Sequence, residues 1–131
     1  MRLRAMIAAD SGSAVAEFVM VVSLLTVLTL SVMQLALALH IRNTVLDAAA
    51  EGARFAALAG SGLDEGAART RDLISAALGP SYAREVEAGY GSFGGHLSAE
   101  VRVIAPLPLL GLIGPDRGLE VVGHAAIEST G

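Results

Sequence analysis

The chain has 131 residues, a formal net charge of -4 and no cysteine or tryptophan. All of its nine basic residues are arginine, and beyond position 42 six arginines stand against eleven acidic residues. This acidic balance argues against binding to nucleic acid and against electrostatic docking on an anionic lipid surface. The absence of cysteine excludes disulfides, zinc–thiolate sites and thiol catalysis.

The N-terminal region joins an arginine-bearing start to a long apolar run. Residues 18–39 carry no charged side chain. As a helix they would span about 33 Å, enough to cross a hydrocarbon core of about 30 Å. The sequence therefore predicts one transmembrane helix, followed by roughly 90 residues that suffice for one small domain.

Two conventional interpretations fit this N-terminus only in part. A secretory signal peptide is disfavoured, because its apolar core is usually about 7 to 15 residues long and gains nothing from an acid such as Glu17. A plain signal anchor keeps Arg2 and Arg4 in the cytoplasm by the positive-inside rule. It leaves Gly12 and Glu17 without a role.

The third interpretation is a prepilin-type leader that a membrane aspartyl peptidase removes between Gly12 and Ser13. Glycine has no side chain to obstruct the peptidase, and it tolerates an extended backbone. Glu17 then becomes the fifth residue of the mature chain, directly before Phe18, the first residue of the apolar run. A carboxylate near lipid usually has a partner, and the new α-amino group of Ser13 on an adjacent subunit is a candidate that would set the axial register.

On this third interpretation the chain has three parts: a leader over residues 1–12, an assembly helix over 13–42 and an extracytoplasmic head over 43–131. Within the membrane run, the Ser and Thr hydroxyls are expected to bond to carbonyls of their own helix. For Gln34, a hydrogen bond to a neighbouring helix and one within its own helix are equally favoured.

Residues 40–59 are rich in alanine and contain no proline, so the helix is predicted to continue beyond the membrane. Polar side chains recur at spacings of three or four and form one stripe, while small apolar side chains form another face. The stripe comprises His40, Asn43 or Thr44, Asp47, Glu51 and Arg54, and the small face comprises Val45, Ala49, Ala53, Ala56 and Ala57.

A second helix is predicted over residues 64–78, stopped by Gly79 and Pro80. Three later segments alternate apolar and polar residues and are predicted strands, namely 85–90, 97–104 and 119–128. The predicted class is therefore α+β, with a small antiparallel sheet of about three strands. Residues 91–95 are the predicted hairpin loop. The apolar connector over 106–115 is either a crossover against the core, which is favoured, or an exposed patch for a partner.

Two motifs carry a resemblance to a known family. The first is Gly-Ser-Ala-Val-Ala-Glu-Phe over residues 12–18, and the second is an Arg-Asn-Thr-x-x-Asp-Ala-Ala-Ala-Glu-Gly-Ala-Arg block over residues 42–54. With the helix–helix–sheet order, they resemble the TadE-like family, pseudopilins of the Tad (type IVc) pilus systems. The residues of the second motif that carry the resemblance are Arg42, Asn43, Asp47, Glu51, Gly52 and Arg54.

The resemblance implies a minor pilin-like structural subunit, held in the cytoplasmic membrane with its N-terminus inside and its head outside. It implies cleavage between Gly12 and Ser13, and Glu17 as the assembly glutamate. The implied partners are an inner-membrane prepilin peptidase, other pilin-like subunits, Tad platform proteins and membrane lipid. The alternative is a single-pass membrane protein whose exterior head captures or senses a partner.

The sequence contains no pattern typical of an enzyme. The three histidines, His40, His96 and His124, lack ligands at converging spacing, so no metal site is predicted. No nucleophile elbow or phosphate-binding loop is present. We therefore expect no catalytic residues, no cofactor, no small-molecule substrate and no nucleic acid.

Overall fold

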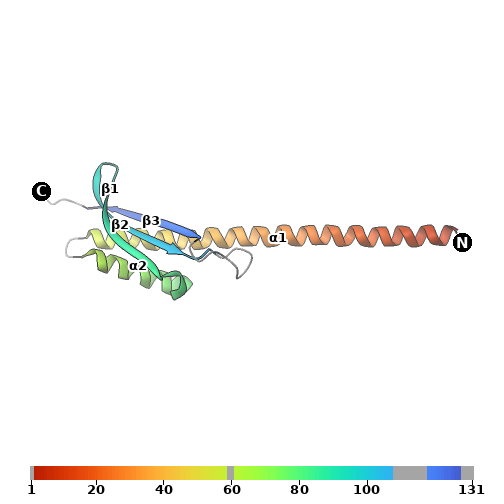
Figure 1. Cartoon of the computed structure of the whole chain (residues 1–131), viewed down its shortest axis with the longest axis horizontal. Helices are drawn as coiled ribbons and strands as arrows, with labels where there is room; N and C mark the ends of the chain where they lie inside the picture. The colour runs from red at the N-terminus through yellow and green to blue at the C-terminus, as the bar shows by residue number, and fades with distance from the viewer. Residues whose placement is uncertain (1, 59–60, 108–117, 128–131) are drawn as a thin grey trace. The chain divides into compact units, whose positions relative to one another are not determined.

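The computed structural model describes residues 2–58, 61–107 and 118–127. Figure 1 shows its elements in chain order. They are α1 (Arg2–Ala57), α2 (Leu63–Leu78), the 3-10 turn η1 (Pro80–Tyr82), β1 (Glu85–Phe93), β2 (His96–Ala105) and β3 (Leu119–Ala126).

The chain divides into two compact units, residues 1–35 and residues 36–131. The described part of the first unit is helical throughout. The second unit, called the head below, holds the end of α1 and all other elements. The predicted α+β class, with a long apolar first helix, a second helix and a three-stranded antiparallel sheet, is confirmed.

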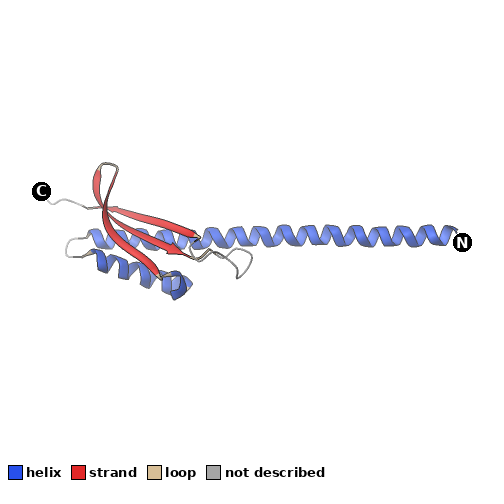
Figure 2. Cartoon of the chain, viewed as in Figure 1, coloured by secondary structure: helices blue, strands red, loops and turns tan. Residues whose placement is uncertain are grey.

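The core of the head lies between the sheet and the two helices (Figure 2). Alternate residues of each strand point toward α1 and α2, as the period-two pattern predicts. Most core side chains are alanine or valine, so the helices can approach the sheet closely. The buried core includes Ile41, Val45, Ala49 and Ala53 of α1, Ala67 and Ile74 of α2, and Val86, Val101, Val103 and Val121 of the sheet.

The three strands pair in the order β1-β2-β3, each antiparallel to its neighbour. The predicted loop over 91–95 is shorter in the structure, because β1 runs on to Phe93 and pairs there with His96. Gly94 and Gly95 alone make the turn, with φ of 61° and 82°. Positive φ at both central residues suits the twist of a two-residue hairpin and favours glycine.

Helix α2 begins one residue earlier than predicted, at Leu63, and ends at Leu78 as predicted. The backbone N–H of Gly62 donates to a carboxylate oxygen of Glu65 at 3.4 Å, which satisfies one free donor at the helix start. Gly79 has φ of 100° and ends the helix. Most of the predicted connector, residues 108–115, lies outside the described residues.

Candidate processing and assembly surfaces

Gly12 lies inside a continuous helical stretch of α1 and has no packing role in the described structure. A Cβ built at this position would meet no atom within 4 Å. Glycine in a helix interior is less favourable than alanine by about 1 kcal/mol, so it makes local unwinding easier. A peptidase that binds extended backbone would gain from that property at the bond between Gly12 and Ser13.

The residues that follow are all exposed on α1. Ser13, Glu17 and Phe18 are solvent-accessible, and Phe18 retains 69% of its exposure. Glu17 is among the described residues for which the structure gives no ion pair within the chain. Its carboxylate is therefore exposed and unpaired within the described chain.

The apolar run keeps large side chains uncovered within its own unit. Among the described residues, one helix is long and apolar enough to cross a membrane, and its most apolar window is not buried at all. Exposed side chains of this size need lipid or other helices around them. This is the property expected of a single-pass membrane protein. The exposed set includes Val15, Phe18, Met20, Leu24, Leu28, Val32 and Leu35.

Three of the four hydroxyls in residues 18–39 bond within their own helix, as predicted, and the structure gives no such bond for Ser23. Thr26 and Thr29 donate to the carbonyls of Val22 and Leu25 at 2.8 Å, and Ser31 donates similarly one turn back. These hydroxyls are thereby satisfied without a second molecule. Gln34 is partly exposed.

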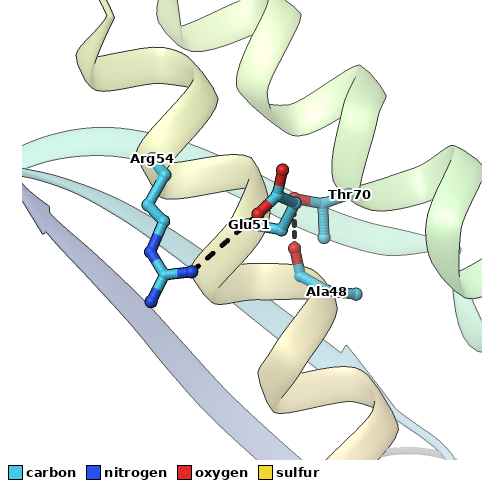
Figure 3. Close-up of polar contacts among 4 residues, drawn as sticks. All are labelled: Ala48, Glu51, Arg54 and Thr70. Atoms are coloured by element: carbon cyan, nitrogen blue, oxygen red, sulfur yellow. Dashed lines mark hydrogen bonds and ion pairs between the residues drawn. The ribbon is translucent and has the colours of Figure 1, made fainter.

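In the head, α1 separates its polar stripe from its small face. Arg42, Asn43, Asp47, Glu51 and Arg54 are all exposed. An Arg54 guanidinium nitrogen lies 4.0 Å from a Glu51 carboxylate oxygen (Figure 3). Both side chains are largely open to solvent, and such a pair contributes little to stability.

Gly52, on another face of α1, lies directly against α2. A Cβ at Gly52 would lie 1.8 Å from the Thr70 hydroxyl oxygen and 2.7 Å from the Gly66 carbonyl oxygen. A Cβ at Gly66 would lie 2.6 Å from the Cβ of Ala56. Both glycines are therefore required for α1 and α2 to pack at this distance.

Thr70 is fully buried at the same crossing. Its hydroxyl donates to the Gly66 carbonyl at 3.0 Å and lies 3.4 Å from the Ala48 carbonyl of α1 (Figure 3). The pattern of residues 64–78 predicted a helix without assigning a packing role to Gly66 or Thr70. The sequence contains one signal for a close helix crossing. Small residues lie four positions apart in both helices, Gly52 with Ala56 in α1 and Gly66 with Thr70 in α2.

The sheet approaches α1 equally closely at Gly123 of β3. A Cβ there would lie 2.4 Å from backbone atoms of Ala49 and Ala50. Because those atoms are backbone, they cannot rotate away as a side chain can. By pattern alone, Gly123 is one position of the predicted strand over residues 119–128.

The outer face of the sheet carries an aromatic and charged cluster. The rings of Phe93 and His124 stack with centroids 4.8 Å apart. The Nδ1 of His124 lies 3.3 Å from a Glu100 carboxylate oxygen, in a geometry that does not make a hydrogen bond. In the register, Ser98 lies on β2, between the strands that carry the two rings and opposite Gly91 and Ala126, and it is only 1% exposed.

Beside this cluster is a shallow hollow of about 260 Å³, lined by Glu87, Gly89, Glu100, Arg102 and Val122 among others. Arg102 pairs with Glu120 at 3.4 Å across β2 and β3, and both are more than half exposed. Within the described ranges, no group of three or more His, Cys, Asp or Glu side chains is placed to hold a metal ion.

Comparison with protein families gives a match to the family described as TadE-like protein over residues 12–54. Searches of curated proteins and of solved structures give no match. The matched stretch begins at Gly12 and contains both motifs, the glycine–glutamate start and the block ending at Arg54. Residues 12–54 are thus a TadE-like segment, and the resemblance in the sequence is confirmed over that stretch.

Proposed function

We propose that this chain is a pilin-like structural subunit of a Tad-type pilus or a related secretion machine. A prepilin peptidase would cut it between Gly12 and Ser13, and the mature N-terminal helix would join it to other pilin-like subunits and to the Tad platform proteins. Its role would be mechanical support of adhesion or secretion, with the N-terminus inside the cytoplasmic membrane and the head outside.

The observation that carries this proposal is the coincidence of three features at one position. The family match begins at Gly12, the glycine has no packing reason to be a glycine, and an exposed apolar helix follows within one or two turns. A plain membrane anchor accounts for the apolar helix alone.

Glu17 supports the same proposal. It is an exposed acid at the edge of the apolar run, without an ion pair inside the described structure. Near lipid a lone carboxylate is costly. An adjacent subunit that begins at Ser13 brings a free amino group, which is mostly protonated at neutral pH, within four residues' rise of this acid.

The direct test is the N-terminal residue of the chain recovered from native membranes, measured by intact mass and by end sequencing. A start at Ser13 is expected. A start at Met1 would overturn the proposal and favour the single-pass protein with a binding head. A start near His40 would overturn both, because the head would then be released.

A further inference from the structure

A groove between α1 and α2 encloses about 500 Å³, and its charged side chains all come from α1. Asp47, Glu51 and Arg54 line it from α1, while Leu73 and Ala77 line it from α2. The groove therefore holds two carboxylates and one guanidinium beside an apolar surface. Its excess of one carboxylate and its apolar side suit the charged head and the methylene stem of a second arginine.

The charges of the groove are not balanced inside the chain. Glu51 has Arg54 at 4.0 Å, but Asp47 has no ion pair or hydrogen bond in the described structure. Asp47 and Glu51 are one turn apart, so like charges repel each other there. A further cation would relieve this repulsion.

Arg42 is an exposed cation of the same helix, and it too lacks a partner in the described parts of the head. It cannot serve Asp47 of its own chain. At 100° per residue, five residues place the two side chains about 140° apart around the helix and about 7.5 Å apart along it. Arg42 and Asp47 therefore face different neighbours.

We propose that Arg42 of one copy of this chain docks beside Asp47 in the α1–α2 groove of a second copy. Because the two groups lie on different faces of α1, the contact is heterologous. Each copy then presents an arginine to one neighbour and a carboxylate to the other. A heterologous contact propagates into a ring or an open filament instead of closing as a dimer.

This pairing rests on the proposed function, in which parallel copies pack through their N-terminal helices. Pairing of Asp47 with Arg42 offsets two such copies by five residues, or about 7.5 Å along the helix.

Cysteine cross-linking tests the pairing, because the natural chain has no cysteine. We would place cysteines at both positions (Arg42→Cys with Asp47→Cys) and oxidise native membranes. Within one helix the two Cα atoms are about 8.7 Å apart, which exceeds the span that a disulfide can bridge, about 7 Å. Any disulfide therefore joins two copies.

The expected result is a ladder of dimers, trimers and higher multimers from the double variant. Either cysteine alone should give dimers at most. A matched control joins Arg42→Cys with Glu87→Cys, an exposed acid on the outer face of β1, and should give no ladder. Absence of the ladder from the double variant, or an equal ladder from the control, would overturn the pairing.

The N-terminal residue of the same chains separates this inference from the proposed function. A start at Ser13 without a ladder would overturn the pairing and leave the function standing. A ladder from chains that start at Met1 would keep the pairing and overturn the function. A disulfide to a different protein in place of the ladder would overturn the assignment of a second copy as the occupant.

Charge reversal gives an independent reading without cysteine. Arg42→Asp and Asp47→Arg should each lower the yield of large assemblies in mild detergent by about fivefold, the factor that one exposed ion pair can supply. The two changes in one chain restore the pair in reversed form and should recover most of the yield. Both positions are exposed, so the substitutions should leave the fold of the head intact. A double variant that gives as low a yield of large assemblies as the single variants would contradict the pairing.

Discussion

The two units use the apolar residues of α1 in opposite ways. In the first unit large side chains are uncovered, with Phe18 69% and Leu24 68% exposed. In the head, small side chains are buried completely, with Val45, Ala49 and Ala53 at 0% exposure. The N-terminal part of α1 thus presents large apolar side chains to its surroundings, whereas the part in the head packs small side chains against α2 and the sheet.

An apolar composition therefore does not by itself mean that the side chains are buried within the chain. Large side chains on an isolated helix gain contacts only from lipid or from other helices. Alanine and glycine bury little apolar surface, but they let two backbones approach closely. Dispersion contacts and short polar contacts between the backbones then stabilise the packing in place of large side chains. The same distinction separates the glycines: Gly12 touches nothing, whereas Gly52 and Gly123 admit no Cβ.

The largest expected effect of a substitution is on leader removal, at Gly12. Replacing it with leucine should leave membrane insertion intact and reduce leader removal to a trace, because a bulky side chain would block the peptidase. Intact mass of the membrane-bound chain measures the outcome. Gly62→Leu is the matched control, since a Cβ at Gly62 also meets nothing within 4 Å, and it should be processed normally. Normal processing of the Gly12 variant would contradict the leader assignment.

The next effect is at Glu17. Glu17→Ala should still be cut after Gly12, but its recovery in sheared pili or large membrane assemblies should fall by about tenfold, which corresponds to about 1.4 kcal/mol. The reason is that the amino group of Ser13 on the adjacent subunit would lose its partner near lipid. Quantitative immunoblotting of the pilus and membrane fractions checks this. Recovery equal to that of the natural chain would refute a role in register.

The next prediction concerns close packing in the head, at Gly52. Gly52→Ala should destabilise the head by about 1–3 kcal/mol, the usual cost of overpacking, because the new methyl meets the Thr70 hydroxyl and the Gly66 carbonyl. Pulse proteolysis in urea, on the full chain in detergent, measures the change in unfolding free energy. Gly89→Ala serves as the control, because a Cβ at Gly89 meets nothing within 4 Å, and it should not destabilise the head by more than a few tenths of a kcal/mol. Equal effects would show that the close crossing is not needed.

The smallest effect is expected on the outer face of the sheet. Phe93→Ala removes the stack on His124 and should cost about 0.5–1.5 kcal/mol, with faster hydrogen exchange at the β1–β2 hairpin. Tyr90→Ala is the control, because Tyr90 is 61% exposed against 64% for Phe93 and the structure gives it no ring contact among the described residues. A larger loss in the Tyr90 variant would argue against a stabilising role for the stack.

Most of the architecture could be predicted because it depends on local periodicity. The structure confirms the elements predicted from such patterns. Residues 18–39 are helical, the polar stripe of residues 40–54 is mostly exposed, and the three alternating segments form strands. The hairpin was less accurate: Gly91 was assigned to the loop, yet it pairs with Ser98. Three glycines within five residues hid the fact that only Gly94 and Gly95 need positive φ.

The contacts that hold the head together could not be predicted, since they join residues far apart in the chain. Nothing local to Gly52 specifies that Thr70 will occupy the space of its missing side chain, or that Gly123 will meet the backbone of Ala49. Likewise Ser98 is a polar position of an alternating strand by pattern, and its burial appears only in the folded sheet, where the rings of Phe93 and His124 stack on the same face.

The sequence by itself determined the membrane-length helix, the two motifs of the TadE-like segment and the order of helices and strands. Periodicity and uninterrupted apolarity act over neighbouring residues, so they can be read without the fold. The tertiary structure alone decided which small residues carry the packing and that Arg42 and Asp47 are both left without partners within the described chain. Close packing and charge balance depend on distances between segments, and those distances exist only once the head has folded.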